Sequence, residues 1–441
     1  MRAYIGSGAG FAGDRFDAGV AVAEHLAACD GPRTLIYECL AERTLALAHG
    51  AEHGWSPWLE TYLEPVLASC LSENIRIVSN MGAADPIGAA RQVHAFAERL
   101  GLRRPRVAVV LGDDITDWGE ERLRALPPFP GDDVPDGRLI AANAYLGARP
   151  VADACTTGAD IVLTGRTTDS ALVLGPLIDA FGWDDLDRLA AGTICGHLLE
   201  CGAQVSGGYF ADPGFKDVPD VANVGFPIAE VSEDGTFTVA KPAGTGGCVK
   251  RATVTEQLLY EMHDPARYLV PDVTCDVSEI ELTDEGTDRV RVTGIRGHAP
   301  PETFKAIVSV EGGWQGETAI SYAGPNALAR AKLAAAVVRE RVRGRGVEAR
   351  VAAHVGGEGA AFRIEVDEPE PDPTARDVRL RMSVLTPERA HAQILCDEML
   401  SLLCSGPAAG GGWRGSVTRQ VATGSVHVDP SDVQPRVEVF E

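Results

Sequence analysis

The stretch Gly196-His197-Leu198-Leu199-Glu200-Cys201-Gly202 holds the pair best suited to moving a proton. His197 and Glu200 are three residues apart, so on a helix their side chains share one face. A histidine beside a carboxylate can act as general acid and base, and we predict both as catalytic residues. Two alternatives stay open: a histidine hydrogen-bonded in the core, or a pair of metal ligands. A third ligand at a recognisable spacing is missing, so we predict no metal.

Polar residues also follow five of the six short β-rich runs in the first 170 residues. They are Glu38, Asn80, Asp113, Asn143 and Arg166, with Asp169 three residues further on. Ligands of open parallel sheets bind beyond the carboxyl ends of the strands, so we predict that this set lines a substrate cleft. Arg166 could grip a carboxylate or phosphate with its fork of donors, while Asp169 could instead cap a helix beginning at Ser170.

A glycine-rich loop follows the first predicted strand. It contains a GxGxxG pattern at Gly8, Gly10 and Gly13, followed by Asp14. Such a loop can bring backbone amides against a phosphate, but Asp14 puts a negative charge where that phosphate would lie. Dinucleotide binding, a general substrate loop and a tight structural turn all remain open. We predict Gly10 and Asp14 as substrate-binding residues.

A second glycine-rich segment, 241–251, combines glycines with cations before a predicted helix. Its candidate binding residues are Gly244, Thr245, Gly246, Gly247 and Lys250. Free amides, a helix N-terminus and lysines predict an anion or oxyanion site. The alternative is a tight turn with solvated cations. We expect this turn and Arg166 to meet in one cavity.

The elements that must position these residues change along the chain. Residues 1–170 alternate β-rich runs at 3–6, 33–37, 75–79, 107–111, 139–142 and 160–164 with helical stretches. One helix has explicit signals, an N-cap at Asp85, a proline at Pro86 and a stop at Gly101. Repeated βα units predict an α/β fold with a mostly parallel, Rossmann-like sheet and helices on both faces. A closed barrel would need eight units, and we find six.

After about residue 280 the pattern becomes a smaller α+β domain. Strands are predicted at 288–295, 304–310, 318–322, 348–355 and 377–385, and helices at 325–343 and from Thr386 to about 403. The segment 367–373 is predicted as a loop and 410–412 as a flexible tip. We therefore divide the chain into an α/β domain, 1–280, and an α+β domain, 281–441.

Composition excludes several classes of function. Among 441 residues, 63 are acidic and 40 basic, a net charge of −23, which repels nucleic acids and anionic membranes. The apolar runs are far shorter than the roughly 20 residues of a membrane span, and the N-terminus lacks the apolar stretch of a secretory signal. We expect a cytoplasmic protein. The ten cysteines lack zinc-site spacing and are expected to be buried thiols.

Several segments together resemble the acyclic terpene utilisation AtuA family. The matching runs are 8–14, 160–166 with Asp169, 196–204, 225–231, 244–247, 256–261 and 271–273. The resemblance implies a link to the breakdown of branched isoprenoid acids as CoA thioesters, but no established reaction or catalytic residues. Many relatives continue into a small ferredoxin-like domain, which we expect to be absent here and supplied by a separate chain.

These observations favour an enzyme acting on a small branched or functionalised acyl compound, such as an acyl-CoA, by hydration, dehydration or carbon–carbon lysis. We expect a lyase with an anionic small-molecule substrate and no cofactor, assembled as a homo-oligomer. One alternative is a non-catalytic subunit or binding protein that joins a small ferredoxin-like partner or a carboxylase. Another is a nucleotide-dependent oxidoreductase, which rests on the GxGxxG pattern alone.

Overall fold

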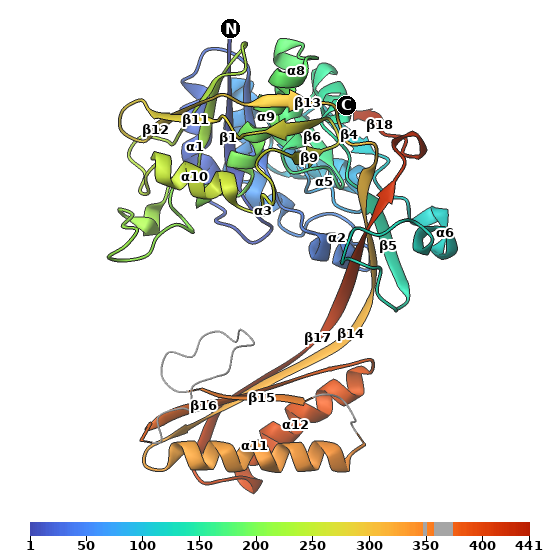
Figure 1. Ribbon diagram of the computed structural model, residues 1–441, viewed down its shortest axis with the longest axis vertical. Helices are drawn as coiled ribbons and strands as arrows, with labels where there is room; N and C mark the ends of the chain where they lie inside the picture. Colours follow the sequence, from blue (N-terminus) through green and yellow to red (C-terminus); the bar gives the residue numbers. More distant parts are fainter. Residues whose placement is uncertain (347–350, 357–373) are drawn as a thin grey trace. The chain divides into compact units, whose positions relative to one another are not determined.

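The computed structural model describes residues 1–346, 351–356 and 374–441. Their contacts form two compact units, Met1–Ser309 with Thr423–Glu441, and Val310–Ala422 (Figure 1). The sequence-based boundary at residue 280 falls inside the first unit. The reason is that β11 (Glu281–Asp284) pairs with β12 (Arg289–Thr293), which pairs with β8 (Phe237–Ala240), so both strands extend the sheet of that unit.

The first unit is built on a ten-stranded mixed sheet in the order β11-β12-β8-β7-β1-β2-β3-β6-β4-β18. Its parallel centre consists of β1 (Arg2–Ala9), β2 (Arg33–Tyr37), β3 (Arg76–Ser79), β6 (Ile161–Thr164) and β4 (Val107–Leu111). Antiparallel strands flank it: β7 (Ile228–Ser232) with β8 on one side, and β18 (Arg436–Phe440) on the other. This order differs from the 3-2-1-4-5-6 order typical of dinucleotide-binding sheets.

Helices cover both faces of this sheet because successive strand residues point to opposite sides. Leu35, Ile77 and Val109 pack with α1 (Ala18–Ala27), α4 (Leu67–Glu73) and α5 (Pro86–Arg99). Their neighbours in the strands pack on the other face with α7 (Arg149–Thr156), α8 (Ala171–Phe181) and α9 (Leu186–Glu200). The remaining elements are α2 (Glu42–Ala48), α3 (Leu59–Leu63), α6 (Glu120–Arg124), α10 (Arg251–Leu259) and a small sheet of β13 (Arg296–His298), β10 (Val273–Asp276) and β9 (Tyr268–Val270).

Local signals predicted some boundaries well and others poorly. Asp85 accepts a hydrogen bond from Gly88 N at 2.8 Å, Pro86 opens α5, and Gly101 adopts φ +68° after it, as predicted. The predicted strand at 139–142 does form, as β5 (Leu139–Ala144), but it pairs with β14 (Phe304–Ala323) and lies outside the parallel sheet. Its role as a sixth parallel strand was therefore wrong.

The second unit is an α+β layer. Its order along the chain is β14, α11 (Ala327–Gly344), β15 (Val351–Gly356), β16 (Asp377–Thr386), α12 (Arg389–Ser405) and β17 (Gly410–Val428). The strands pair in the order β15-β16-β14-β17, antiparallel at β15/β16 and β14/β16. A β-α-β-β-α-β chain in this order is the ferredoxin-like arrangement. The second unit of this chain therefore has a ferredoxin-like topology. A separate ferredoxin-like subunit stays a prediction.

Two local predictions for the second unit were wrong. Thr386 ends β16, and α12 begins three residues later, after Glu388. Residues 410–412 begin β17 and do not form a free tip. The predicted loop at 367–373 lies outside the described residues. In the part of the chain that the structure describes, no helix combines the length and apolarity needed to cross a membrane.

Candidate active site

A cavity of about 880 Å³ lies in the first unit, among the strand-end loops and the segments 261–274 and 299–305. Its volume falls in the range of roughly 300–1,000 Å³ typical of small-molecule sites. Its lining includes the carboxylates of Glu42, Asp169, Glu200, Glu261 and Glu302, and the cations of Arg267 and Lys305. Negative side chains thus outnumber positive ones, and we call it the acidic cavity.

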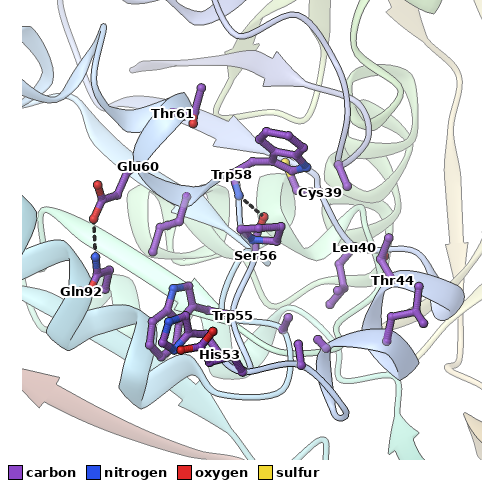
Figure 2. Close-up of a pocket in the computed structure, with 18 residues that line it drawn as sticks. Cys39, Leu40, Thr44, His53, Trp55, Ser56, Trp58, Glu60, Thr61 and Gln92 are labelled. Carbon is purple, nitrogen blue, oxygen red and sulfur yellow. Dashed lines mark hydrogen bonds between the residues drawn. The ribbon is translucent and has the colours of Figure 1, made fainter.

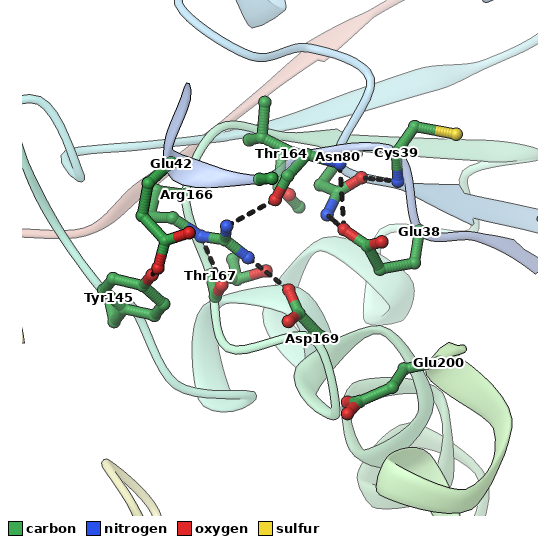
Figure 3. A network of polar contacts seen from close by, with 12 residues as sticks. Glu38, Cys39, Glu42, Asn80, Tyr145, Thr164, Arg166, Thr167, Asp169 and Glu200 are labelled. Carbon is green, nitrogen blue, oxygen red and sulfur yellow. Dashed lines mark hydrogen bonds and ion pairs between the residues drawn. The ribbon is translucent and has the colours of Figure 1, made fainter. Parts of the chain in front are cut away.

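Arg166 organises the loop that follows β6 (Figure 3). It is 2% exposed, its Nε donates to Thr167 O at 2.8 Å, and its two terminal nitrogens donate to Leu40 O and to the Asp169 carboxylate. The Tyr145 ring lies 4.6 Å from the guanidinium. Burial lowers the pKa of Arg166, but Asp169 and Tyr145 outweigh that effect and raise it. These contacts give Arg166 a structural role, and its predicted grip on a substrate anion stays a prediction.

Glu38 and Asn80 form the next part of the network. Glu38 Oε1 accepts from Leu40 N at 2.8 Å and from Asn80 Nδ2 at 2.9 Å, and Asn80 Oδ1 accepts from Cys39 N at 2.7 Å. Burial and the charge of Asp169 raise the pKa of Glu38 to about 8, although Arg166 opposes this rise. Glu38 therefore keeps its proton at neutral pH.

Asp113 and Asn143 complete the network on the other side of Arg166. Asp113 Oδ2 accepts from the Arg166 backbone N at 2.8 Å and from Asn143 Nδ2 at 3.0 Å. Burial raises the pKa of Asp113 to about 6, although these hydrogen bonds lower it. The predicted strand-end residues therefore lie together in one network. Of these six, Asp169 alone is among the described residues that line the acidic cavity.

His197 and Glu200 form the predicted pair, but the two differ in access. His197 is 1% exposed, with Nδ1 3.0 Å from Glu200 Oε1 and Nε2 3.0 Å from Leu258 O, so both ring nitrogens are occupied. Burial lowers the pKa of His197, but the Glu200 hydrogen bond outweighs it and raises the pKa. Glu200 lines the acidic cavity, and burial raises its pKa to about 7 against the effect of His197.

The first glycine-rich loop is held by its own residues. Gly10 N donates to Asp14 Oδ2 at 2.9 Å, and Arg15 N donates to Asp14 Oδ1 at 2.8 Å. A Cβ at Gly10 would lie 2.3 Å from the carbonyl carbon of Cys201, so glycine lets the loop pack on the end of α9. The amide that a phosphate would need is taken by Asp14. These contacts favour the structural interpretation of Gly10 and Asp14.

The second glycine-rich segment is also bonded to its own surroundings. Gly246 N donates to Asn223 O and Gly247 N to Pro219 O, each at 2.8 Å, and Lys241 Nζ lies 3.1 Å from Asp288 Oδ2. Within the turn, the Thr245 hydroxyl donates to Pro242 O, and Gly244 adopts φ +78°.

The 244–250 turn does not join the acidic cavity. A Cβ at Gly246 would lie 2.0 Å from Asp220 O, and Lys250 Nζ lies 5.1 Å from the centre of the Phe210 ring. Among the described residues, none of 244–250 lines the acidic cavity, and the hydrogen bonds and ion pair of Arg166 go to other segments. The predicted meeting of the two segments in one cavity was therefore wrong.

The sequence did not single out a second polar cluster of the cavity. Tyr145 donates a short hydrogen bond to the Glu42 carboxylate, and Lys305 Nζ lies 3.7 Å from Glu42 Oε1. Tyr145 N donates to Lys305 O at 2.8 Å, because the chain leaving β5 runs beside β14. Two features of the sequence could have pointed to this cluster. Tyr145 comes two residues after Asn143, and Lys305 is one of only five lysines.

One residue of the lining carries an unsatisfied polar atom. Thr168 lines the cavity, and its hydroxyl oxygen is buried and has no hydrogen-bond partner among the described residues. A buried polar group is normally satisfied by a partner, so this hydroxyl is an exception among the polar groups of the site. Within the described part of the chain, no three His, Cys, Asp or Glu side chains form a group that could hold a metal ion.

Comparisons with known proteins give little detail about activity. A solved hydantoinase/carbamoylase family amidase from Burkholderia ambifaria is similar at 13% identity, with a TM-score of 0.17, over 27% of this chain and 31% of that one. A likeness this partial carries no argument about fold or function. No curated protein matches the chain.

The comparison with family models is much broader. The model of the acyclic terpene utilisation family protein AtuA matches residues 3–439. That match spans both units, including the strand-end network, the His197–Glu200 pair and both glycine-rich segments. The chain therefore belongs to the acyclic terpene utilisation AtuA family.

Proposed function

We propose that the acidic cavity is the active site of an enzyme that moves a proton on a small acyl substrate, with Glu200 as general acid and base. The observation that supports this most is a cavity-lining carboxyl whose pKa is about 7. A group with a pKa near the working pH can both take and give a proton. The name of the family refers to acyclic terpenes, which favours a branched acyl group.

Other side chains have supporting roles in this proposal. His197 positions Glu200, because its second nitrogen is bound to Leu258 O and its ring is enclosed. Lys305 and Arg267 are the cations of the lining, and they would hold a carbonyl oxygen or an anionic group of the substrate. Tyr145, bonded to Glu42, is the second proton donor.

The reaction that fits these groups is the loss or addition of water. In dehydration, the Glu200 carboxylate takes a proton from the carbon next to the carbonyl, and the β-hydroxyl leaves as water with a proton from Tyr145. Hydration is the reverse. In carbon–carbon lysis, the same base takes the proton of the β-hydroxyl. The bond between the α and β carbons then breaks to give a carbonyl compound and an enolate, and Tyr145 protonates the enolate at carbon. An enzyme that catalyses any of these reactions would be a lyase.

Deuterium exchange tests the proposal without knowledge of the direction of the reaction. Branched acyl-CoAs are incubated with the protein in D₂O, and NMR follows deuterium entering the carbon next to the carbonyl. Glu200→Gln should slow exchange by about 10²- to 10⁴-fold because it removes the base. Glu98→Gln, an exposed carboxylate on α5, is the matched control and should exchange like the parent. Equal rates in the parent and Glu200→Gln would contradict the proposal.

A further inference from the structure

A second cavity, of about 720 Å³, lies beside α2 and α3 (Figure 2). Leu40, Leu47 and Ala48 contribute to one part of its lining, and Trp55, Pro57 and Trp58 to another. We call it the tryptophan cavity. Leu47 is 36% exposed and Trp58 41% exposed, so large apolar side chains are left open to solvent where they meet a concave surface. Exposed apolar surface gathered at a hollow marks a binding site more often than a packing fault.

The two indoles are held in place by a short, well-bonded segment. Ser56 N donates to Met81 O at 2.9 Å, and Trp58 N donates to Ser56 Oγ at 3.3 Å. The Trp55 ring stacks on His53 at 4.6 Å between ring centres, and the Trp58 ring lies 5.3 Å from Phe16. The cavity wall is therefore formed before any ligand arrives, which lowers the entropy cost of binding.

The polar side chains that line the tryptophan cavity restrict the kind of ligand that can bind there. Glu52 and Glu60 both line the cavity, and a bound anion would meet their repulsion. Glu60 is already paired, with Arg99 and with Gln92. Among the described residues, neither indole N–H of the wall donates a hydrogen bond, so both can donate to a ligand. An uncharged hydrocarbon with one accepting oxygen meets all of these conditions.

The tryptophan cavity is distinct from the acidic cavity, although one segment contributes to both. Cys39 and Leu40 line the tryptophan cavity, while Glu42 lines the acidic one. The backbone of Cys39 and Leu40 is bonded to Asn80, Glu38 and Arg166. The hydrogen-bond network around Arg166 thus contacts the backbone of two residues that line the tryptophan cavity.

We propose that the tryptophan cavity is a binding site for a small, uncharged, largely hydrocarbon ligand that carries a hydrogen-bond-accepting oxygen. The site stands apart from proton transfer in the acidic cavity. Its ligand is held by apolar contact with the indoles and leucines, and its oxygen is oriented by an indole N–H.

Calorimetric titration with the methyl ketones from 2-hexanone to 2-decanone tests the site directly. Each methylene buried should raise the affinity about fourfold until the cavity is full. Ala48→Phe occupies the cavity and should weaken binding of 2-octanone at least tenfold. Ala336→Phe adds the same ring at an exposed position of α11 and should bind like the parent. If Ala48→Phe does not fold, Trp58→Ala, at an exposed position, should weaken binding instead.

Three results would overturn the proposal: no heat of binding, an affinity independent of chain length, or equal affinities in the parent and in the folded cavity variants. A fourth result would also contradict it, namely a loss of ketone binding in Glu200→Gln. Because that substitution leaves the tryptophan cavity unchanged, the ketone would then bind in the acidic cavity. Because the readout is binding, failure here is separate from failure of the deuterium-exchange experiment.

Discussion

The strand-end network and the 244–250 turn look alike in sequence but differ in what their polar groups contact. Around Arg166, buried donors and carboxylates bind one another and reach the acidic cavity through Asp169. In the turn, the amides of Gly246 and Gly247 bind nearby carbonyls, and just before it the Lys241 ammonium is paired with Asp288. The difference teaches that a cluster of polar residues indicates a ligand site only when one of its members reaches a cavity, as Asp169 does.

The largest effect is expected when the centre of the network is removed. Arg166→Met leaves Leu40 O, Thr167 O and the Asp169 carboxylate without their donor, so we expect a loss of about 3–5 kcal/mol in unfolding free energy. Denaturant titration measures it. Arg251→Met, at an exposed arginine, should change stability by less than about 0.5 kcal/mol. Similar values for both variants would mean that the network is not the stronger of the two regions.

Glu38→Gln should change how stability depends on pH. The folded-state pKa of Glu38 is about 8 and its unfolded-state value is near 4.5, so the native protein binds the extra proton between these values. Stability due to this group is complete below pH 4.5 and is lost as pH rises towards 8. The parent should therefore lose roughly 3 kcal/mol more than Glu38→Gln between pH 5 and 8. Parallel curves of Tm against pH would show that Glu38 does not hold its proton.

The smallest effect is expected in the turn. Lys250→Ala removes an ammonium that lies over the Phe210 ring, which is worth about 0.5–1 kcal/mol at such sites. Deuterium exchange should stay within about twofold of the parent, because the turn does not line the acidic cavity. A tenfold slower exchange would instead show that the turn belongs to the active site, and the two regions would then not differ in this respect.

Much of the local structure followed from residue patterns. The cap and proline at 85–86 marked the start of α5, and the β-rich runs matched the strands of the parallel centre. The strand-end residues were predicted as a set because parallel strands end at one edge of a sheet. Glu38, Asn80, Asp113 and Arg166 do lie together, while the substrate cleft that they were expected to line stays a prediction.

Other features were beyond the reach of local patterns. The pattern of β5 shows a strand but not its partner, and only its pairing with β14 brings Tyr145 beside Lys305. Lys305 and Glu42 are separated by more than half of the chain, so no spacing rule links them. The spacing of His197 and Glu200 places both on one face of a helix, but it does not show which of them is accessible. Packing leaves Glu200 at the cavity and encloses His197.

The sequence by itself determined the strands of the parallel centre, the start of α5, the polar residue types at the strand ends and membership of the AtuA family. These depend on short-range backbone preferences and on residue type, which the local chain sets. The tertiary structure alone decided which groups remain accessible: Glu200 and not His197, the acidic cavity and not the glycine turn. Accessibility depends on long-range packing, because a polar group is available to a ligand only when distant segments leave part of it exposed at a cavity.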